Sequence, residues 1–479
     1  MPDRNAFERY ASPNEQRCVS REDLGWYHAV IIGAIYEFQP DFIDNNLACR
    51  SFFYPLKRCI EKHPYLCVAV NDMHTDKPFY ESVPTINLED HISIVNDPAA
   101  VNDQVAAIER VLSQQLDLPF TRGIPPWRTV VLPLGPNQCF VAFAFSHIIG
   151  DGPTGTAFHR TFLEACRSIP DLKSSEPHII KTPVRPLPPP FDTPERLPIS
   201  WSFLLAPLIA SILPHFIVKL LGLPLGASPV DAGTWTGSPT AYDPRTSHSK
   251  IKLCEFEAAL MKNAIHVSRK HDAKFTGTLH QLVTRALSKA ITNPDVTNFI
   301  SQTTINMRRS IGIPDDEMGN FVSGCYVVHP RSNLSGPLSD EEWEGARSAT
   351  QAFATRAASL QNQLVGLLRY LSSIRKWTLA KIGQQRDSSY EISNVGAMDV
   401  GQDKSTGHMG QASITKMVFA QPGHITSNPI AFNIISVKGG SLVCTVTWSA
   451  RALGMPENDE EWFVDQLCSS LTEGMKSLE

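Results

Sequence analysis

Short apolar runs rich in β-branched and aromatic residues alternate along the chain with segments whose apolar residues recur at helical spacing. Residues 27–38 (YHAVIIGAIYEF) are of the first kind and predict a buried strand. Residues 105–116 are of the second kind and predict a helix. Two further runs, 127–134 and 138–145, flank a Gly-Pro-Asn turn and predict a hairpin.

The same mixture continues through the rest of the chain. Further strands are expected at 65–70, 250–256, 299–307, 324–329, 430–437 and 442–448. Further helices are expected at 44–62, 257–271, from 276 onward with Thr276 or Thr278 as the cap, 340–381 and 458–475. Because strands and helices intermix in both halves, the pattern predicts an α+β fold.

The length of 479 residues favours two or three domains. A proline-rich stretch at 181–198 indicates the start of an interdomain linker. We therefore expect an N-terminal domain over 1–180, a proline-rich and apolar linker over 181–246, and a C-terminal domain over 247–479.

The most apolar segment of the chain, residues 201–225, is long enough for a membrane span, but three prolines and a lysine interrupt it. A buried or interfacial helical hairpin is the first interpretation. Weak peripheral contact with a membrane is the second, and a true span is the third.

Charge and cysteine usage narrow the class of protein. The formal net charge is -5, with no basic stripe, which argues against nucleic acid as a partner. Ten cysteines contain no C-x-x-C pair, so we expect buried free thiols and no metal site. The N-terminal residues 1–17 lack the apolar core of a secretory signal, so we expect a cytoplasmic protein, at most peripheral to an internal membrane.

One stretch, residues 140–167, combines a strand, a tight turn and a helix in a pattern that suits catalysis. The apolar strand ends at Ser146, His147 and Asp151 follow in the sequence SHIIGDG, and a helix begins near Thr154. The glycines are expected to permit the turn. A histidine at a strand end can act as a general base, since its ordinary pKa lies near neutrality. A histidine at a strand end is more often structural than catalytic, so the spacing alone favours a structural role for His147.

The segment SHIIGDG resembles the H-x-x-x-D-G motif of the CoA-dependent acyltransferase superfamily, which includes chloramphenicol acetyltransferases, BAHD acyltransferases, condensation domains and alcohol acetyltransferases. Other stretches resemble alcohol acetyltransferases in the same order, at 8–10, 24–27, 63–66, 116–128, 305–309, 318–321 and 391–396. The chain has no D-F-G-W-G, unlike BAHD enzymes, and Ser146 stands where condensation domains usually have a second histidine.

The resemblance implies two chloramphenicol-acetyltransferase-like domains with an active-site tunnel between them. His147 would deprotonate a hydroxyl that attacks an acyl-CoA carbonyl, and oxyanion donors would stabilise the intermediate. Asp151 would hold the motif loop through an arginine, either Arg128 or Arg308. The residues expected to contact substrate are Gly152, Ser393 and Asn394. The other histidines considered, expected to be structural or solvent-facing, are His159, His329 and His424.

The implied function is transfer of an acyl group, expected to be acetyl, from acyl-CoA to a small hydrophobic alcohol. Acyl-CoA is a co-substrate, and no bound cofactor is expected. Residues 201–225 would line the acceptor entrance with apolar side chains. Three alternatives remain: an amine acceptor, a condensation-like reaction with a carrier-bound acyl group, and a catalytically idle ligand-binding homologue. We expect a monomer.

Overall fold

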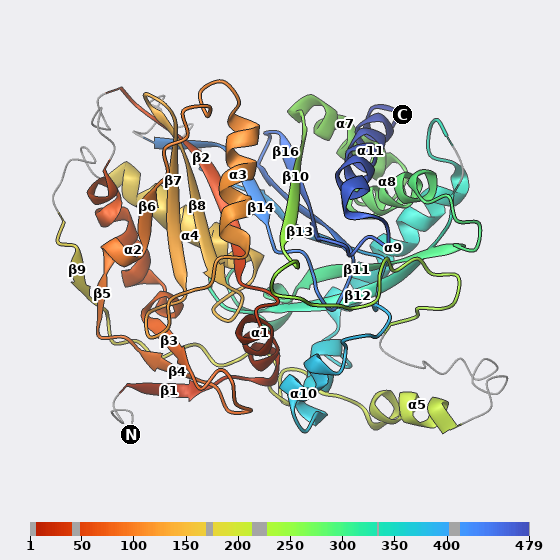
Figure 1. The fold of residues 1–479 in the computed structure, drawn as a ribbon, viewed down its shortest axis with the longest axis horizontal. Helices are drawn as coiled ribbons and strands as arrows, with labels where there is room; N and C mark the ends of the chain where they lie inside the picture. The colour runs from red at the N-terminus through yellow and green to blue at the C-terminus, as the bar shows by residue number, and fades with distance from the viewer. Residues whose placement is uncertain are drawn as a thin grey trace.

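Two β-sheets with their helices lie side by side and meet along the centre of the molecule (Figure 1). The structure is a computed structural model, and it describes residues 6–40, 48–168, 176–212, 228–332, 335–401 and 412–478. Each half combines a sheet with helices, so the α+β expectation is confirmed.

The first sheet has five strands in the order β14-β2-β8-β7-β6. Their bounds are Ala29–Phe38 for β2, Ile92–Ile94 for β6, Trp127–Gly135 for β7, Gln138–Ser146 for β8 and Ala412–Ala420 for β14. The helices α2 (Phe53–Lys62) and α4 (Gly152–Ser168) pack with one apolar face of this sheet. Helix α3 (Gln104–Leu116) packs on the other face, beside the second sheet.

Strand β14 comes from the second half of the chain and pairs antiparallel with β2 of the first. Its register places Phe419 opposite Ile32. In Figure 1 the blue β14 accordingly lies beside the red β2. The hydrophobic pattern did not predict this strand. The proposed domain boundaries at 180 and 246 stay a prediction. Because β14 belongs to the sheet of the first half, no single boundary in the sequence divides the two sheets.

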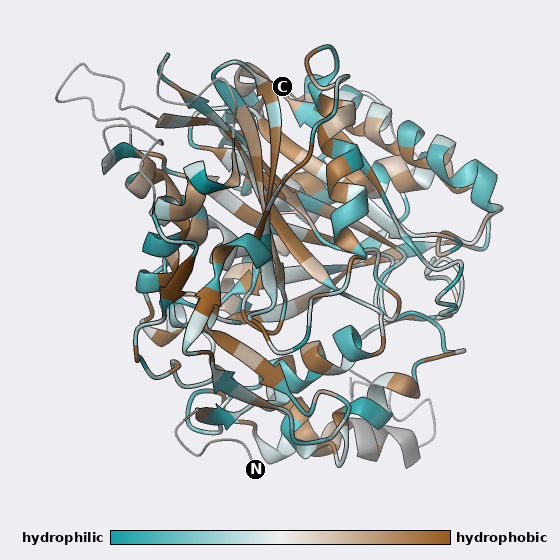
Figure 2. Ribbon diagram, turned by 60° about the vertical axis from the view of Figure 1, so that its left-hand side comes forward, coloured by the Kyte–Doolittle hydropathy of each residue, from teal (hydrophilic) through white to brown (hydrophobic). Residues whose placement is uncertain are grey.

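The second sheet has six strands in the order β10-β16-β15-β13-β11-β12. Their bounds are Ser249–Phe256 (β10), Asn298–Asn306 (β11), Val322–Pro330 (β12), Tyr390–Met398 (β13), Ile430–Val437 (β15) and Leu442–Ser449 (β16). Four helices share a core with it, namely α7 (Ala258–Lys270), α8 (Phe275–Ala290), α9 (Asp340–Ala358) and α11 (Glu457–Lys476). Figure 2 shows the apolar strands gathered at the centre and hydrophilic residues on the outer helices.

Smaller elements complete the molecule. The strands β1 (Phe7–Tyr10), β4 (Phe79–Ser82) and β3 (Val68–Asn71) form a three-stranded sheet, and β5 (Thr85–Asn87) pairs with β9 (Ile179–Lys181). Helix α1 (Pro13–Asp23) begins with a capping box in which Ser12 and Glu15 exchange hydrogen bonds, which explains its start at this position. The single-turn 3-10 elements are η1 (Cys49–Phe52), η2 (Pro64–Cys67), η3 (Leu88–Asp90) and η4 (Arg309–Ile311).

Both predicted hairpins, β7–β8 and β15–β16, are confirmed. The helical region expected at 340–381 consists of three elements rather than one, because α9 ends at Ala358 and is followed by η5 (Leu364–Tyr370) and α10 (Ile374–Leu379). Asn362 between them has a positive φ of 61°, which no helix accommodates. Lys274, rather than Thr276 or Thr278, caps α8.

The apolar segment 201–225 begins as helix α5 (Trp201–Ile212). Trp201, Leu205 and Ile209 on this helix are exposed, so the part described is not buried, and the interfacial form of the expected hairpin stays a prediction. Residues 213–225 lie outside the described residues. Among those described, no helix is both long and apolar enough to cross a membrane.

Candidate active site

His147 follows directly on β8, the strand between β2 and β7 in the first sheet. The Ser146 hydroxyl at the strand end donates to Glu22 and accepts from the Ile148 amide at 3.1 Å. The Tyr80 hydroxyl donates to the Ile148 carbonyl at 2.9 Å. These bonds turn the chain away from the sheet at His147, as the sequence predicted.

A cavity of about 570 Å³ opens beside His147, with walls from both halves of the molecule. The first half contributes α1, β2 and the start of α4. The second contributes β11, β12, β13, η5, α10 and the loop after β14. All the residues that the resemblance assigned to the site lie on this wall, namely His147, Asp151, Gly152, Ser393 and Asn394.

The His147 ring is held from the side of its Nδ1 atom. The Asn320 Nδ2 atom lies 3.3 Å from this nitrogen and 3.3 Å from the His147 carbonyl oxygen. The Cys18 thiol is hydrogen-bonded to the same ring, and Asn320 Nδ2 lies 3.3 Å from its sulfur. Within the described part of the chain no partner occupies Nε2, so this is the nitrogen available to a substrate.

Cys18 is buried on α1 at a position where its thiolate is favoured. Burial alone would raise the pKa of the thiol, but the His147 ring and the guanidinium groups of Arg21 and Arg17 lower it to about 6. A neutral ring with its proton on Nδ1 would donate to this thiolate and leave Nε2 free, and Asn320, whose Oδ1 is buried without a partner, would then present its oxygen to the ring. Sequence reasoning did not place this cysteine at the site.

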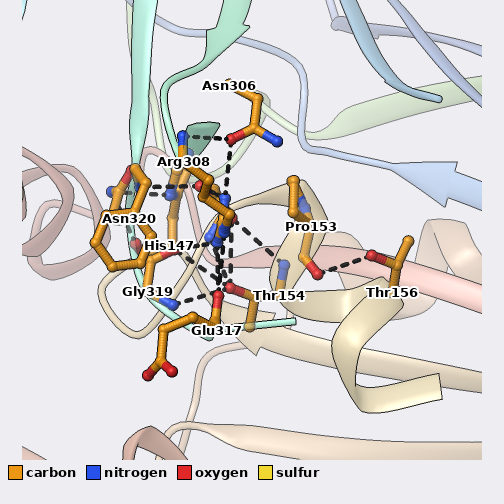
Figure 3. A network of polar contacts seen from close by, with 11 residues as sticks. His147, Pro153, Thr154, Thr156, Asn306, Arg308, Glu317, Gly319 and Asn320 are labelled. Carbon is orange, nitrogen blue, oxygen red and sulfur yellow. Dashed lines mark hydrogen bonds and ion pairs between the residues drawn. The ribbon is translucent and has the colours of Figure 1, made fainter. Parts of the chain in front are cut away.

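Asp151 does not face the substrate as a free carboxylate, because it forms a two-pronged ion pair with Arg308, which Figure 3 shows among its other polar contacts. Both nitrogen–oxygen distances are 2.8 Å, and the two side chains are 1% and 0% exposed. Asp151 Oδ2 also accepts from the Phe321 amide at 2.9 Å. Arg308 in turn donates to the carbonyls of Glu317 and Gly319. The motif loop is thereby fastened to residues 317–321 of the second half.

Of the two arginines considered, the structure selects Arg308. Arg128 instead donates to the Gln115 side chain at 2.6 Å and to the carbonyls of Gln115 and Leu118. It lies over the Phe120 ring and makes no contact with Asp151.

The glycines of the motif serve close packing rather than an unusual backbone conformation, which corrects our explanation of the turn. Neither Gly150 nor Gly152 is among the glycines with positive φ. A Cβ atom on Gly150 would lie 2.2 Å from the Thr154 hydroxyl oxygen, and one on Gly152 would lie 2.6 Å from Val395. Any larger residue would push apart α4 and β13 or the loop itself.

Ser393 and Asn394 lie on β13 and are held by neighbours. The Ser393 hydroxyl shares a hydrogen bond with Thr304 at 3.1 Å, and Asn394 Nδ2 donates to Thr276 at 3.1 Å. Both side chains therefore present fixed polar surface to the cavity. Gly396, two residues on, has a φ of +91° that only glycine adopts readily.

Two of the three other histidines are structural, as expected. His159 is buried between the Tyr36 hydroxyl and the Ile32 carbonyl, and His329 is hydrogen-bonded to Ser301. Burial lowers the pKa of each to about 4, so both are neutral. His424 is different, because it lines the cavity with its Nε2 atom buried and 3.6 Å from Glu391. The expectation that His424 is structural or solvent-facing stays a prediction.

Sequence reasoning also missed the polar wall next to His147. Tyr27 lies between the rings of His147 and His424, with centroids 5.7 Å and 5.5 Å away. Its hydroxyl donates to Gln421, which donates to Glu391 at 2.8 Å. Burial raises the pKa of the Glu391 carboxyl. Two arginines of α1, Arg17 and Arg21, complete this wall.

Another part of the cavity lining is apolar, but the described side chains of the expected segment do not form it. Residues 201–206 and 209 are absent from the lining. The apolar lining comes from η5, α10 and the turn between them, through Leu364, Val365, Leu367, Leu368, Leu371 and Trp377. In the described ranges no cluster of three or more His, Cys, Asp or Glu side chains could hold a metal ion. All ten cysteines are free.

Comparison with known proteins agrees with this geometry. Over 469 residues the chain is 25% identical to an uncharacterized protein of Schizosaccharomyces pombe, covering 95% of this chain and 94% of that protein. A probable alcohol acetyltransferase of Fusarium pseudograminearum is 21% identical and is matched over 84% of this chain and 83% of its own length.

Solved structures show the fold. A trichothecene 15-O-acetyltransferase from Fusarium sporotrichioides superposes with a TM-score of 0.66 at 12% identity, covering 98% of this chain and 94% of that one. The first condensation domain of the calcium-dependent antibiotic synthetase gives 0.60 at 10% identity, covering 99% and 98%. The two-domain acyltransferase architecture is therefore confirmed.

A family model for alcohol acetyltransferases matches residues 42–473, which is most of the chain. Members of such a family use an acyl-CoA as co-substrate and an alcohol as acceptor. The chain belongs to the alcohol acetyltransferase family and is an acyltransferase.

Proposed function

We propose that the protein transfers an acetyl group from acetyl-CoA to the hydroxyl of a largely apolar small molecule, with His147 as the general base. The observation that carries this proposal is the placement of His147 on a cavity shared by both halves, with Nδ1 occupied and Nε2 without a partner among the described residues. A ring in this state accepts a proton from a hydroxyl that lies within hydrogen-bond reach.

The reaction needs no protein nucleophile. The hydroxyl loses its proton to Nε2 and attacks the thioester carbonyl. The tetrahedral intermediate then collapses, and the thiolate of CoA leaves with the proton returned by His147. The thiolate of Cys18 on the Nδ1 side stabilises the imidazolium that exists between these two steps.

An apolar acceptor follows from the wall formed by η5 and α10. Each Å² of apolar surface removed from water there contributes about 25 cal/mol. The leucines at 364, 367, 368 and 371 and Trp377 offer such surface. A sugar would have to give up hydration against these side chains without a matching hydrogen bond.

The test is CoA release by the purified protein with acetyl-CoA and a panel of alcohols and amines. His147→Ala should lower kcat by about two to four orders of magnitude, the range of a general base. His178→Ala is the control, because His178 is exposed and away from the cavity. Near-normal turnover by His147→Ala would refute the mechanism. Release of CoA with amines in preference to alcohols would refute the proposed acceptor.

A further inference from the structure

Two guanidinium groups face the cavity, and Arg21 donates a weak hydrogen bond to the Cys18 sulfur at 3.8 Å. Arg17 and Arg21 stand one helical turn apart on α1, on the same face of the helix, and both line the cavity. Among the described residues neither forms an ion pair, and the Nε atom of each is buried with no hydrogen-bond partner. Buried donors are nearly always satisfied, so this pair is an exception that needs a cause.

The carboxylates on the same cavity wall are already engaged. Glu391 accepts from Gln421 at 2.8 Å and from Asn428 at 3.2 Å. Asp387 is paired with Lys381 at 3.0 Å. Burial and the charge of Arg21 lower the pKa of Arg17, which shows that the protein itself gives the cation little compensation. Even with Cys18 as a thiolate, two guanidinium groups share one neighbouring anion, so the region carries excess positive charge.

The arginines are close to the reacting centre. The Arg21 guanidinium carbon lies 4.7 Å from the Tyr27 ring centroid, and that ring lies 5.7 Å from the His147 ring. The guanidinium carbon of Arg21 is thus at most about 10.4 Å from the centre of the His147 ring. The phosphates of CoA are separated from its sulfur by the whole pantetheine arm. With the thioester carbonyl at His147, an extended CoA would carry its phosphates beyond this point.

We propose that Arg17 and Arg21 form a subsite for a carboxylate carried by one of the two substrates near its reacting end. This inference rests on the proposed function for its geometry, because it measures the subsite from a hydroxyl at His147. Guanidinium groups match carboxylates well, through parallel N–H···O bonds. The carboxylate belongs either to the acceptor, which is then a hydroxy acid with an apolar body, or to the acyl group of a dicarboxylic thioester.

The experiment uses three probe acceptors, namely 6-hydroxyhexanoate, its methyl ester and 1-hexanol, and two donors, acetyl-CoA and malonyl-CoA. Binding of the acceptors is measured by calorimetry and transfer by CoA release. If the carboxylate belongs to the acceptor, 6-hydroxyhexanoate binds at least tenfold more tightly than its ester. If it belongs to the acyl group, 1-hexanol reacts with malonyl-CoA at a kcat/KM at least tenfold above that with acetyl-CoA.

In Arg17→Gln and Arg21→Gln whichever preference is found should fall to less than about threefold, with the affinity for free CoA unchanged. Arg122→Gln is the matched control, since Arg122 pairs with Asp23 of helix α1 but is itself exposed. Arg17→Gln should also be at least as stable to heat as the wild type, because it removes an uncompensated cation. A lower melting temperature would mean that Arg17 supports the fold, which would count against a binding role.

Absence of a carboxylate preference in both arms overturns the subsite, even if 1-hexanol is acetylated well and the proposed function stands. Weaker CoA binding in both arginine variants, without any carboxylate preference, would also overturn it. Tight binding of 6-hydroxyhexanoate that depends on both arginines, with no CoA release from any donor, would support the subsite and refute the proposed acetyl transfer.

Discussion

The ion pair between Asp151 and Arg308 should dominate the stability of the motif loop, and Asp151→Asn tests this. The substitution keeps the shape of the side chain but removes its charge, so that Arg308, which is 0% exposed, is left without a counter-ion. It also replaces one accepting oxygen with an amide that cannot accept from the guanidinium. Breaking a buried pair in this way costs about 3–5 kcal/mol.

Such a loss is a large part of the total free energy of unfolding, which is about 5–15 kcal/mol for native proteins. We expect the urea midpoint, followed by tryptophan fluorescence, to fall clearly in Asp151→Asn. Activity should fall with it at temperatures where the variant is still folded, since the same pair holds the loop of His147 against residues 317–321.

The matched control is Asp97→Asn, because Asp97 also pairs with an arginine through two nitrogens. That pair is exposed, with Arg110 48% accessible, so its loss should change stability little. The double variant Asp151→Asn with Arg308→Gln should lose less than the sum of the single losses. An unchanged midpoint together with lost activity would refute this reasoning and make Asp151 a direct participant in catalysis.

Three further outcomes are expected. Burial raises the pKa of the Glu22 carboxyl from about 4.5 to about 8, so between these pH values the folded protein holds a proton that the unfolded chain releases. The free energy of unfolding should therefore fall as the pH rises through this range. Glu22→Gln should flatten the curve of melting temperature against pH, and a curve unchanged from that of the wild type would contradict this. Below about pH 6 the Cys18 thiolate takes up a proton, so kcat/KM should decline more steeply with acid in the wild type than in Cys18→Ser; equal acidic limbs in the two pH profiles would show that the thiolate does not support His147. Gly152→Ala should reduce turnover at least tenfold, because its Cβ atom would lie too close to Val395. Gly439→Ala lies in an open turn with positive φ and should lower stability without changing turnover. Steady-state rates and melting curves of both variants check this.

The strand, turn and helix around His147 could be predicted from the sequence because they are local. An apolar run ended by a small polar residue predicts a strand end, and the β8 strand does end at Ser146. The identity of the Asp151 partner could not be predicted in this way. From the sequence, Arg128 and Arg308 are equally plausible partners. Only the fold brings Arg308 next to Asp151, from which it is separated by 157 positions in the chain.

Strand β14 and the polar wall on α1 escaped prediction for different physical reasons. The pairing of β14 with β2 joins segments almost four hundred residues apart, and strand formation depends on such partners more than on intrinsic preference. Helix α1 had a local signal that we did not use, since Ser12 and Glu15 are spaced as a capping box. Recognising it would have placed Arg17, Cys18 and Arg21 on one helix.

The contacts between the halves also determine how substrates reach His147. A hinge motion that separated the two sheets would have to break the buried pair of Asp151, in the motif loop after β8, and Arg308, which follows β11. That pair cannot open cheaply, because the guanidinium would lose its partner in a buried setting. The cavity is therefore preformed, and substrates must enter through its existing openings. In such a cavity the charged wall on α1 and the apolar wall on η5 and α10 stay in fixed positions relative to Nε2 of His147. An acceptor is then selected by whether its hydroxyl, its apolar body and its charge match three fixed points at once. A molecule that meets only one of these points would gain too little binding energy to hold its hydroxyl in line for attack.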